Sequence, residues 1–269
     1  MPEGHTIHRL AAEIDRRFGR RPVAVSSPQG RFADGAALLD GRKVVSAEAH
    51  GKHLFVRFTG MQYLHVHLGL YGKFDLGRTP APDPVGQVRL RMVNKTSWGH
   101  LRGATTCEVL DPDGKAAVMA RLGDDPLDPG ADGEIAWRKI SRSTTPIGAR
   151  LMDQAVTPGV GNVYRAEVLF RAGIDPLRES RSLTREEWDA IWADLVGLLR
   201  EGVRTGRIDT VRPEHEPEAM GRPPRVDDHG GEVYVYRRQG QPCHVCGSEI
   251  RTRELAGRNL FWCPTCQRA

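Results

Sequence analysis

The stretch CHVCGSEIRTRELAGRNLFWCPTC, residues 243–266, contains two Cys-x2-Cys pairs separated by sixteen residues. This spacing is typical of one tetrahedral zinc site, with Cys243, Cys246, Cys263 and Cys266 as ligands. Four thiolates close the coordination shell, so we expect one structural zinc ion. The tail over 230–269 is too short to bury much core, and zinc would supply roughly 10–16 kcal/mol of apparent folding energy.

The residues between the two cysteine pairs predict a β-hairpin. Side chains alternate over 250–255, Ala256-Gly257 is typical of a turn, and Arg258 opens the second strand. Residues 230–269 hold six Arg and three Glu, so +3 of the net charge of +5 lies in this tail. A zinc hairpin with a basic tip fits a nucleic-acid groove. On the tail alone, a zinc ribbon that contacts proteins is an equal alternative.

Length and composition limit which domain organisation, partners and location the chain can have. At 269 residues with 39% hydrophobic residues, it can form two domains, or one domain and a small module. The basic residues are 33 Arg and 6 Lys, which suggests a polyanionic partner. No run approaches the roughly 18 apolar residues of a membrane helix, and no apolar signal segment is present, so we expect a cytoplasmic protein that does not enter a membrane. Cys107, outside the cysteine cluster, is expected to be a buried strand residue.

The chain starts Met1-Pro2-Glu3-Gly4. Removal of Met1 would leave Pro2 with a free secondary amine, whose ordinary pKa of about 8 leaves a usable neutral fraction at pH 7. A secondary amine that attacks an aldehyde-like carbon forms an iminium ion, which is Schiff-base chemistry. Glu3 is a candidate general acid beside it. Taken alone, these four residues fit an ordinary chain start better than a catalytic site.

The N-terminal half predicts one helix followed by a β-sandwich or barrel-like layer. Apolar residues with helical spacing predict a helix over 3–18, which would fix Pro2 against a core. Alternating apolar residues predict strands near 54–58, 64–68 and 88–92.

Two features of these strands bear on chemistry. Lys52 lies in a turn after Gly51, where it could approach a phosphate, replace Pro2 as the nucleophile, or simply face solvent. His65 and His67 share one face of a strand, and with no carboxylate or cysteine close to them in the sequence they are interpreted as histidines of a half-exposed face.

The turn Leu68-Gly69-Leu70-Tyr71-Gly72 ends one of these strands. Large apolar side chains on an exposed loop are unusual, and proteins that open a DNA duplex use such wedges to fill the base stack. Packing of Leu70 and Tyr71 in the core is the competing interpretation.

The second half is predicted to be helical. Short helices are expected over 147–154 and 162–172, with Gly173 as a stop, and a longer helix follows the capping box Thr184-x-x-Glu187. Asn162 follows a glycine-rich turn, where it could cap its helix, contact a phosphate, or do both. Residues 205–238 show little periodicity and predict a long mobile loop.

Taken together, Pro2-Glu3-Gly4, Gly51-Lys52, the Gly159-Val160-Gly161-Asn162 turn and the four-cysteine hairpin with Arg258 resemble the formamidopyrimidine-DNA glycosylase / endonuclease VIII family of base-excision repair enzymes. The resemblance covers nearly the whole chain and is nearest to the actinobacterial endonuclease VIII-type proteins. It implies an α+β fold. An N-terminal helix and β-sandwich lobe would be linked to a helix-two-turn-helix lobe, which ends in the zinc-finger β-hairpin.

The resemblance also implies a mechanism and its residues. Pro2 would attack C1′ of the damaged nucleotide and displace the base, and β,δ-elimination would then cut the strand. Glu3 would transfer protons and Lys52 would assist the elimination. Asn162 and Arg258 would bind phosphates, and Arg258 would also assist the second elimination. Leu70 and Tyr71 would fill the gap left by the flipped base, and Arg121 and Arg102 would add DNA contacts.

The sequence departs from the family at two places. His5-Thr6 stands where many members have Pro-Glu, which puts the sugar-side hydrogen-bond network in doubt. Gly69 stands where one branch has Gln, so a smaller wedge is expected.

We therefore expect a bifunctional DNA glycosylase/AP lyase that removes oxidised pyrimidines. The alternatives are the same mechanism on oxidised purines (formamidopyrimidine or 8-oxoguanine), or a catalytically silent protein that binds damage. The expected partner is damaged double-stranded DNA, bound by a monomer associated with the nucleoid and without a small-molecule cofactor. The expected division is a catalytic lobe over 1–122, a linker over 123–134, a DNA-binding lobe over 135–229 and the zinc finger over 230–269.

Overall fold

Helix α1 (Gly4–Phe18) follows Pro2 and Glu3 at the start of the chain. Its buried stripe contains Ile7, Ala11, Ile14 and Phe18, which confirms the predicted helix within one residue. Arg16 and Arg17 lie in the last turn, where the negative end of the helix dipole favours cations.

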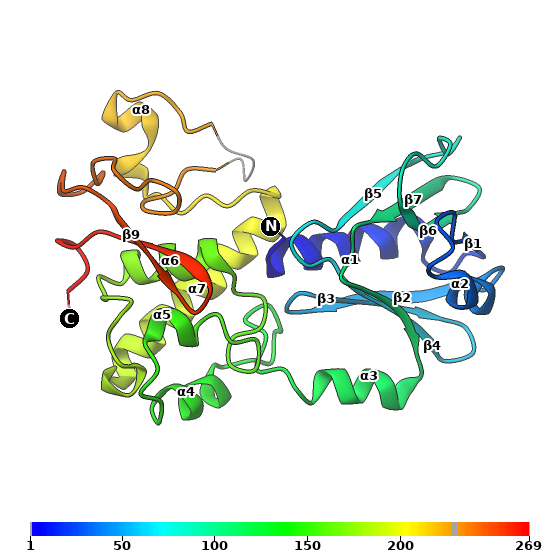
Figure 1. Cartoon of the computed structure of the whole chain (residues 1–269), viewed down its shortest axis with the longest axis horizontal. Coiled ribbons are helices and arrows are strands. Elements are labelled where there is room, and N and C mark those ends of the chain that lie inside the picture. Colours follow the sequence, from blue (N-terminus) through cyan, green and yellow to red (C-terminus); the bar gives the residue numbers. More distant parts are fainter. Residues whose placement is uncertain (1, 227–230, 269) are drawn as a thin grey trace. The chain divides into compact units, whose positions relative to one another are not determined.

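The computed structural model describes residues 2–226 and 231–268 (Figure 1). The chain folds into two compact units, residues 1–121 and 122–269. The expected removal of Met1 and the expected boundary at 229/230 lie outside the described residues.

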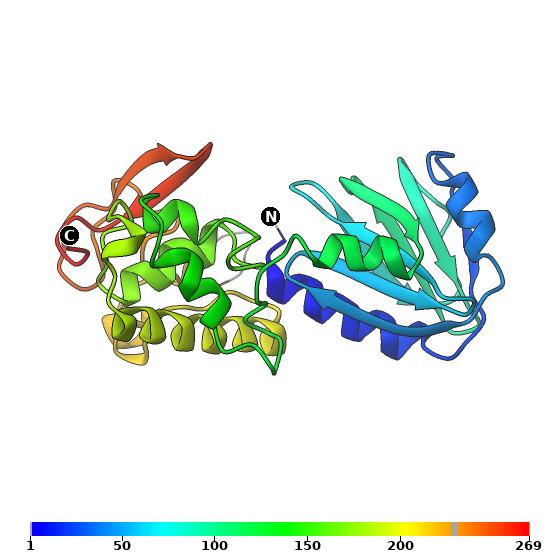
Figure 2. The ribbon, with the colours of Figure 1, turned by 90° about the horizontal axis from the view of Figure 1, so that it is seen from below.

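The first unit is a β-sandwich, as predicted. One four-stranded antiparallel sheet has the order β2-β3-β4-β8 and the other has the order β1-β6-β7-β5 (Figure 2). The strands have the following bounds: β1 Ala24–Ser26, β2 Val44–His50, β3 His53–Phe58, β4 Gln62–His67, β5 Lys73–Arg78, β6 Val88–Val93, β7 Ser97–Arg102 and β8 Thr106–Leu110.

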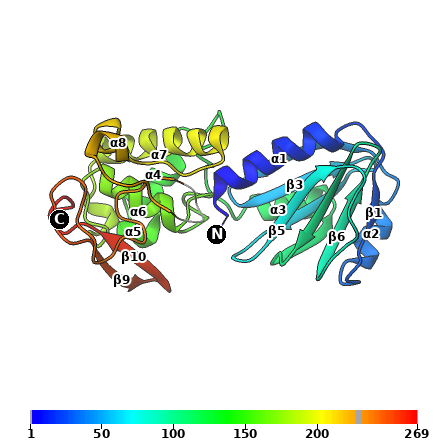
Figure 3. The same cartoon turned by 90° about the horizontal axis from the view of Figure 1, so that it is seen from above.

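Three helices accompany these sheets. Helix α1 packs along β2 and β3, α2 (Ala33–Leu39) contacts β1, and α3 (Pro112–Met119) contacts β4 and β8 (Figure 3). A single apolar core joins the α1 stripe to both sheets, with Val56 and Leu64 from one sheet and Leu90 and Leu101 from the other. Cys107 is buried on β8, as expected.

The second unit contains α4 (Glu134–Ile140), α5 (Ile147–Arg150), α6 (Asn162–Arg171), α7 (Arg185–Thr205) and α8 (Pro217–Met220), with short 3-10 turns at Ser180–Ser182 and Pro213–His215. Thr184 and Glu187 form the predicted capping box of α7. Trp188 and Trp192 of α7 are buried in the core of this unit. Together with the sandwich, this gives the α+β class predicted from the sequence.

The prediction of a helix over 147–154 is wrong beyond Arg150. Side chains in this region bind the backbone and compete with helical hydrogen bonds. The Ala155 amide donates to Asp153 Oδ1 (2.9 Å), and Thr157 Oγ1 donates to the Leu151 carbonyl (2.7 Å).

The prediction of one mobile loop over 205–238 is also wrong for much of that segment. Ile208, Val211 and residues 233–236 are buried in the core of the second unit. The backbone amides of 234–236 donate to the buried carboxylate of Glu167 on α6. A loop that buries apolar side chains and fills its hydrogen bonds is held in place.

The predicted hairpin is formed by β9 (Arg251–Leu255) and β10 (Arg258–Trp262), which pair antiparallel. Ala256 and Gly257 connect them, and both have positive φ (52° and 71°), as a tight two-residue hairpin turn requires. None of the helices in the described ranges has the length and apolar character needed to cross a bilayer.

Candidate functional site

Pro2 and Glu3 lie directly before the first turn of α1. Glu3 occupies the N-cap position, and its carbonyl accepts hydrogen bonds from the amides of Thr6 (3.0 Å) and Ile7 (3.4 Å). Pro2 is half-buried and Glu3 is fully buried. The helix therefore fixes the chain start, and the position after a removed Met1 would carry a secondary amine beside a sequestered carboxyl group.

Lys52 lies in the two-residue turn that joins β2 to β3. Gly51 before it has a φ of 56°, which glycine adopts without strain. The ring Nδ1–H of His67 donates to the Lys52 carbonyl (3.1 Å), so the neighbouring strand β4 holds the turn. The Lys52 side chain is half-exposed on the first unit.

A histidine cluster lies behind this turn and consists of His53, His65 and His67. His65 Nδ1 is 2.8 Å from Glu108 Oε1, and His65 Nε2 is 2.9 Å from His53 Nδ1. The interpretation of His65 as a residue of a half-exposed face is wrong, because its side chain is buried. The pairing of β8 with β4 also brings a carboxylate, Glu108, opposite His65. Since Glu108 accepts only from a protonated Nδ1, neutral His65 accepts from His53.

The histidine cluster also shifts proton affinities. Burial lowers the pKa of His53 to about 3, and the charges of His67, His65, His50 and Arg121 lower it further. Burial also lowers the pKa of His67. These two rings are therefore neutral at pH 7.

The side chains of Leu70 and Tyr71 are exposed by 46% and 83% in the turn between β4 and β5, so the interpretation that they pack in the core is wrong. Gly69 has a φ of 68°, and a Cβ there would lie 1.9 Å from Thr105 Oγ1. In the present conformation of the turn, therefore, only glycine fits at position 69.

Arg102 ends strand β7, opposite Lys73. Its Nη1 donates to Asp75 Oδ2 (2.7 Å) and its Nε donates to the Val85 carbonyl (3.1 Å). Arg102 thus lies beside the exposed turn, and its guanidinium is bound to β5 and to the segment before β6. Arg121 is exposed at the end of the first unit.

Asn162 is the first residue of α6, and the N-cap position belongs to Gly161, so the interpretation of Asn162 as a helix cap is wrong. Instead, Asn162 Nδ2 donates to the carbonyl of Asn259 on β10 (3.0 Å). Arg165, which is fully buried, donates to the Asn162 side chain and to the same Asn259 carbonyl (3.0 Å). Sequence reasoning missed Arg165, although its three-residue spacing from Asn162 on a helix is the signal that could have identified it.

Arg258 precedes Asn259 and is exposed at the hairpin tip. Among the described residues, no side chain or carbonyl binds its guanidinium. The second unit therefore brings the predicted residues Asn162 and Arg258 to one place, with Arg258 available for an external anion.

The four cysteines of the predicted metal site converge. Their sulfur atoms all lie within 4.8 Å of one another, with separations of 3.8 Å for Cys243–Cys266 and 3.4 Å for Cys246–Cys263. Zinc–sulfur bonds of about 2.3 Å in a tetrahedron place the sulfurs about 3.8 Å apart, so the set fits one zinc ion. The amides of Val245 and Cys266 donate to two of these sulfurs, which favours thiolates. The cysteines are a site for one structural zinc.

Three family models match this chain along most of its length. Residues 1–103 match the formamidopyrimidine-DNA glycosylase N-terminal domain, and residues 122–213 match the formamidopyrimidine-DNA glycosylase H2TH domain. Residues 240–269 match the zinc finger found in FPG and IleRS. The three matches occur in the order that the fold requires, with the sandwich first and the hairpin last.

Whole-chain relatives agree with these matches. Endonuclease 8 1 of Mycobacterium tuberculosis is 54% identical over 271 aligned residues, covering 99% of this chain and 100% of that protein. Formamidopyrimidine-DNA glycosylase of Thermus thermophilus is 33% identical and covers 99% of this chain and 97% of its own length.

Solved structures support the fold. The Lactococcus lactis Fpg in complex with abasic-site DNA has a TM-score of 0.80 at 22% identity, covering 99% of this chain and 100% of that chain. The fold has two units, with a proline next to a buried glutamate in the first and a four-cysteine hairpin in the second. These features and the relatives of this identity and coverage identify the family. The chain belongs to the formamidopyrimidine-DNA glycosylase and endonuclease 8 family of DNA repair enzymes, which are DNA glycosylases with AP lyase activity.

Proposed function

We propose that this protein removes oxidised pyrimidines from DNA through a Schiff base on the amine of Pro2. The observation that carries this proposal is the position of Pro2 and buried Glu3 at the fixed start of α1. The full-length similarity to an endonuclease 8 supports it.

In the proposed reaction, the neutral amine of Pro2 forms a bond to C1′ of the damaged nucleotide as the bond from C1′ to the base breaks. The Pro2 nitrogen loses its N–H proton once the new bond has formed, and the base leaves with that proton. The ring oxygen takes the proton of the Glu3 carboxyl group when the sugar opens. The resulting iminium ion acidifies C2′, so loss of a proton there expels the 3′ phosphate, and a second elimination expels the 5′ phosphate. Water finally releases the sugar remnant and restores the amine.

The other predicted residues have supporting roles in this proposal. Lys52 binds a phosphate from its turn and favours the departure of that leaving group. Asn162 and Arg258 hold phosphates beside the flipped nucleotide, and Arg258 assists the second elimination. Leu70 and Tyr71, which are exposed on their turn, fill the gap in the base stack. Arg102 and Arg121 add DNA contacts from the first unit.

The preferred lesion separates two versions of the same enzyme. The resemblance of Pro2-Glu3-Gly4 to the endonuclease VIII branch favours pyrimidines. The 33% identity to a formamidopyrimidine-DNA glycosylase favours oxidised purines as the second candidate. In both versions we propose that a monomer acts on damaged double-stranded DNA.

Borohydride trapping tests the proposal. Duplexes with an abasic site, an oxidised pyrimidine or an oxidised purine are mixed with the zinc-loaded protein and reduced, and the adduct is mapped by mass spectrometry. We expect an adduct on a Met-free N-terminal Pro2, most abundant with the oxidised pyrimidine. A matched control carries two extra residues ahead of Met1, which turns the Pro2 nitrogen into an amide and should abolish the adduct while DNA binding persists.

The other outcomes are equally informative. An adduct on Lys52 would move the nucleophile and contradict the role of Pro2. Most adduct with the oxidised purine would select the second candidate. Tight binding without any adduct would show a silent protein that only binds damage.

A further inference from the structure

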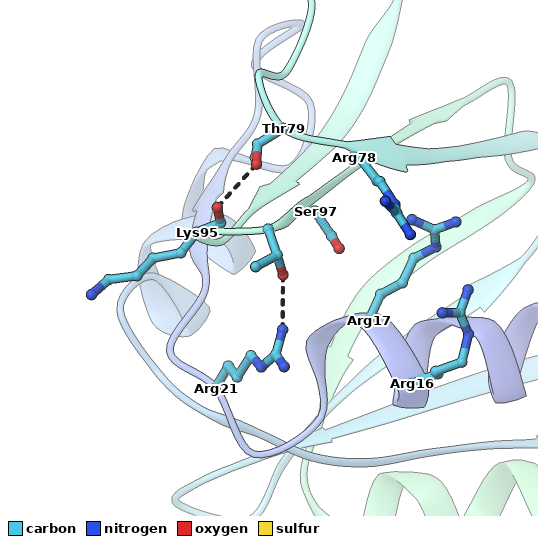
Figure 4. Close-up of a pocket in the computed structure, with 8 residues that line it drawn as sticks. Arg16, Arg17, Arg21, Arg78, Thr79, Lys95 and Ser97 are labelled. Atoms are coloured by element: carbon cyan, nitrogen blue, oxygen red, sulfur yellow. Dashed lines mark hydrogen bonds between the residues drawn. The ribbon is translucent and has the colours of Figure 1, made fainter.

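A basic hollow lies at the C-terminal end of α1 in the first unit, far along the helix from Pro2. It has a volume of about 490 Å³ and is lined by Arg16, Arg17, Arg21, Arg78, Thr79, Lys95, Thr96 and Ser97 (Figure 4). We call it the arginine pocket. The residues come from α1, the segment after it, the end of β5 and the turn between β6 and β7.

All five ionisable residues that line the arginine pocket are basic. Glu13, one turn earlier on α1, binds Arg16 (2.7 Å) and Arg17. The hydrogen bond from Arg16 lowers the pKa of Glu13 and keeps it ionised. Glu13 cancels one of the five charges, and the negative end of α1 offsets about half of another. A net positive charge above three therefore remains.

The geometry of the arginine pocket favours an anion. In Figure 4 the guanidinium groups of Arg17 and Arg78 point toward each other from α1 and β5. Within residues 2–226 and 231–268, the side chains of Arg78 and Lys95 have no hydrogen bond or ion pair. Arg21 Nη1 donates to Thr96 Oγ1 (2.8 Å), which orients a third guanidinium at the rim. Like charges brought together repel unless an anion lies between them.

The lining identifies the class of ligand. It contains only arginine, lysine, threonine and serine, so it offers no surface for a stacked base or an apolar peptide anchor. Arginine forks match phosphate oxygens bidentately, and hydroxyl groups add donors. Phosphate groups of a nucleic-acid backbone fit this lining better than an acidic protein segment does.

The distance along α1 separates this pocket from the Pro2 site. The helix has 15 residues, which at 1.5 Å each span about 22 Å. That length corresponds to roughly six base pairs of duplex at about 3.4 Å each. A contact in the pocket is therefore distinct from a contact with the damaged nucleotide.

We propose that the arginine pocket is a second phosphate-binding site that holds the DNA backbone away from the lesion. The phosphates come either from the flank of the same duplex or from a second DNA segment. The proposal rests on the proposed function in so far as the protein binds DNA, but it does not depend on Pro2 chemistry.

The test compares two double variants that each remove two positive charges. Arg21→Ala/Arg78→Ala removes two of the five cations that line the arginine pocket. The control, Arg31→Ala/Arg200→Ala, removes exposed arginines outside the pocket and outside the proposed site. Thermal unfolding first establishes that both variants are folded. Affinity for abasic duplexes of about 12 and about 40 base pairs is then measured from 50 to 200 mM salt.

For the longer duplex, we expect the slope of log affinity against log salt to be shallower by about 1.8 in the pocket variant, because each phosphate contact contributes about 0.9. Over this salt range the pocket variant would lose roughly tenfold less affinity than the wild type. The control should keep the wild-type slope, and trapping on the 12-base-pair duplex should be equal for all three proteins.

A second arm distinguishes the two sources of phosphate. Wild-type protein saturated with the 12-base-pair abasic duplex is titrated with a separate undamaged duplex. Binding of that duplex, lost in the pocket variant, identifies a second segment, whereas a length effect without such binding identifies the flank. Equal salt slopes for both double variants on both duplexes, without pocket-dependent binding of the separate duplex, would overturn the proposal. So would a pocket that binds poly-glutamate and not DNA. Failure of trapping in the wild type would instead contradict the Pro2 mechanism and leave the salt comparison intact.

Discussion

Replacement of Glu167 by glutamine should destabilise the second unit severely. This carboxylate is fully buried on α6 and accepts four hydrogen bonds. Oε2 accepts from the Tyr234 amide (2.7 Å) and Thr210 Oγ1 (2.6 Å), and Oε1 accepts from the amides of Val235 (2.9 Å) and Tyr236 (2.8 Å). Glutamine has nearly the same shape, but its NH2 group would face two donors.

The cost follows from this geometry. Hydrogen bonds to a charged group contribute roughly 1.5–3 kcal/mol each, so the loss of two costs about 3–6 kcal/mol. The easier burial of a neutral amide offsets part of this, because a buried charge carries a desolvation penalty of several kcal/mol. We therefore expect a net loss of about 3 kcal/mol in the free energy of unfolding. In a unit of about 150 residues, that corresponds to a decrease in Tm of roughly 6–12 °C.

Urea unfolding, followed by tryptophan fluorescence, measures the effect on zinc-loaded protein. Trp188 and Trp192, in the core of the same unit, contribute to this signal. The matched control is Glu218→Gln, the same chemical change at an exposed position of α8, which should stay within about 0.5 kcal/mol of the wild type. If the free energy of unfolding of Glu167→Gln lay within about 1 kcal/mol of the wild-type value, that would refute the idea that this carboxylate holds residues 234–236 in place.

Four other results are expected. Unfolded His53 takes up a proton below pH 6.5, but the folded ring does so only near pH 3. The free energy of unfolding should therefore decrease as the pH is lowered from 6.5 to 3, by up to about 1.4 kcal/mol per pH unit. Urea titrations of His53→Gln should show a shallower dependence of that free energy on pH. Burial raises the pKa of Cys107 to about 12, so iodoacetamide should leave this thiol unlabelled in folded, zinc-loaded protein, and a labelled Cys107 peptide would contradict its burial. Glu3→Gln should bind abasic DNA yet lose base excision in a strand-cleavage assay, and unchanged excision would remove Glu3 from the mechanism. Arg258→Ala should weaken DNA binding about tenfold, as loss of one charged contact of about 1.4 kcal/mol implies, with an unchanged zinc content, and zinc loss would assign Arg258 a structural role.

The parts of the fold that local sequence determines were predictable. The apolar stripe of α1, the alternating strands and the Cys-x2-Cys spacing each depend on residues close in the chain. The same holds for the capping box at Thr184, because its partner is three residues away.

The failures involve residues that meet only after folding. His65 finds Glu108 through the pairing of β4 with β8, which periodicity does not specify. The segment after α7 lacks apolar periodicity because a single carboxylate on α6 satisfies its backbone. Asn162 has an ordinary capping sequence, yet its side chain is drawn to a carbonyl of the hairpin. In each case a long-range polar partner overrides a local preference.

The turn at Gly69 restricts how this sequence can change over evolution. Two obstacles coincide there, a left-handed backbone and the hydroxyl of Thr105, so no single substitution at position 69 avoids both. A lineage that acquires a side chain at 69 must first alter 105 or rebuild the turn. We therefore expect the two positions to vary together among relatives.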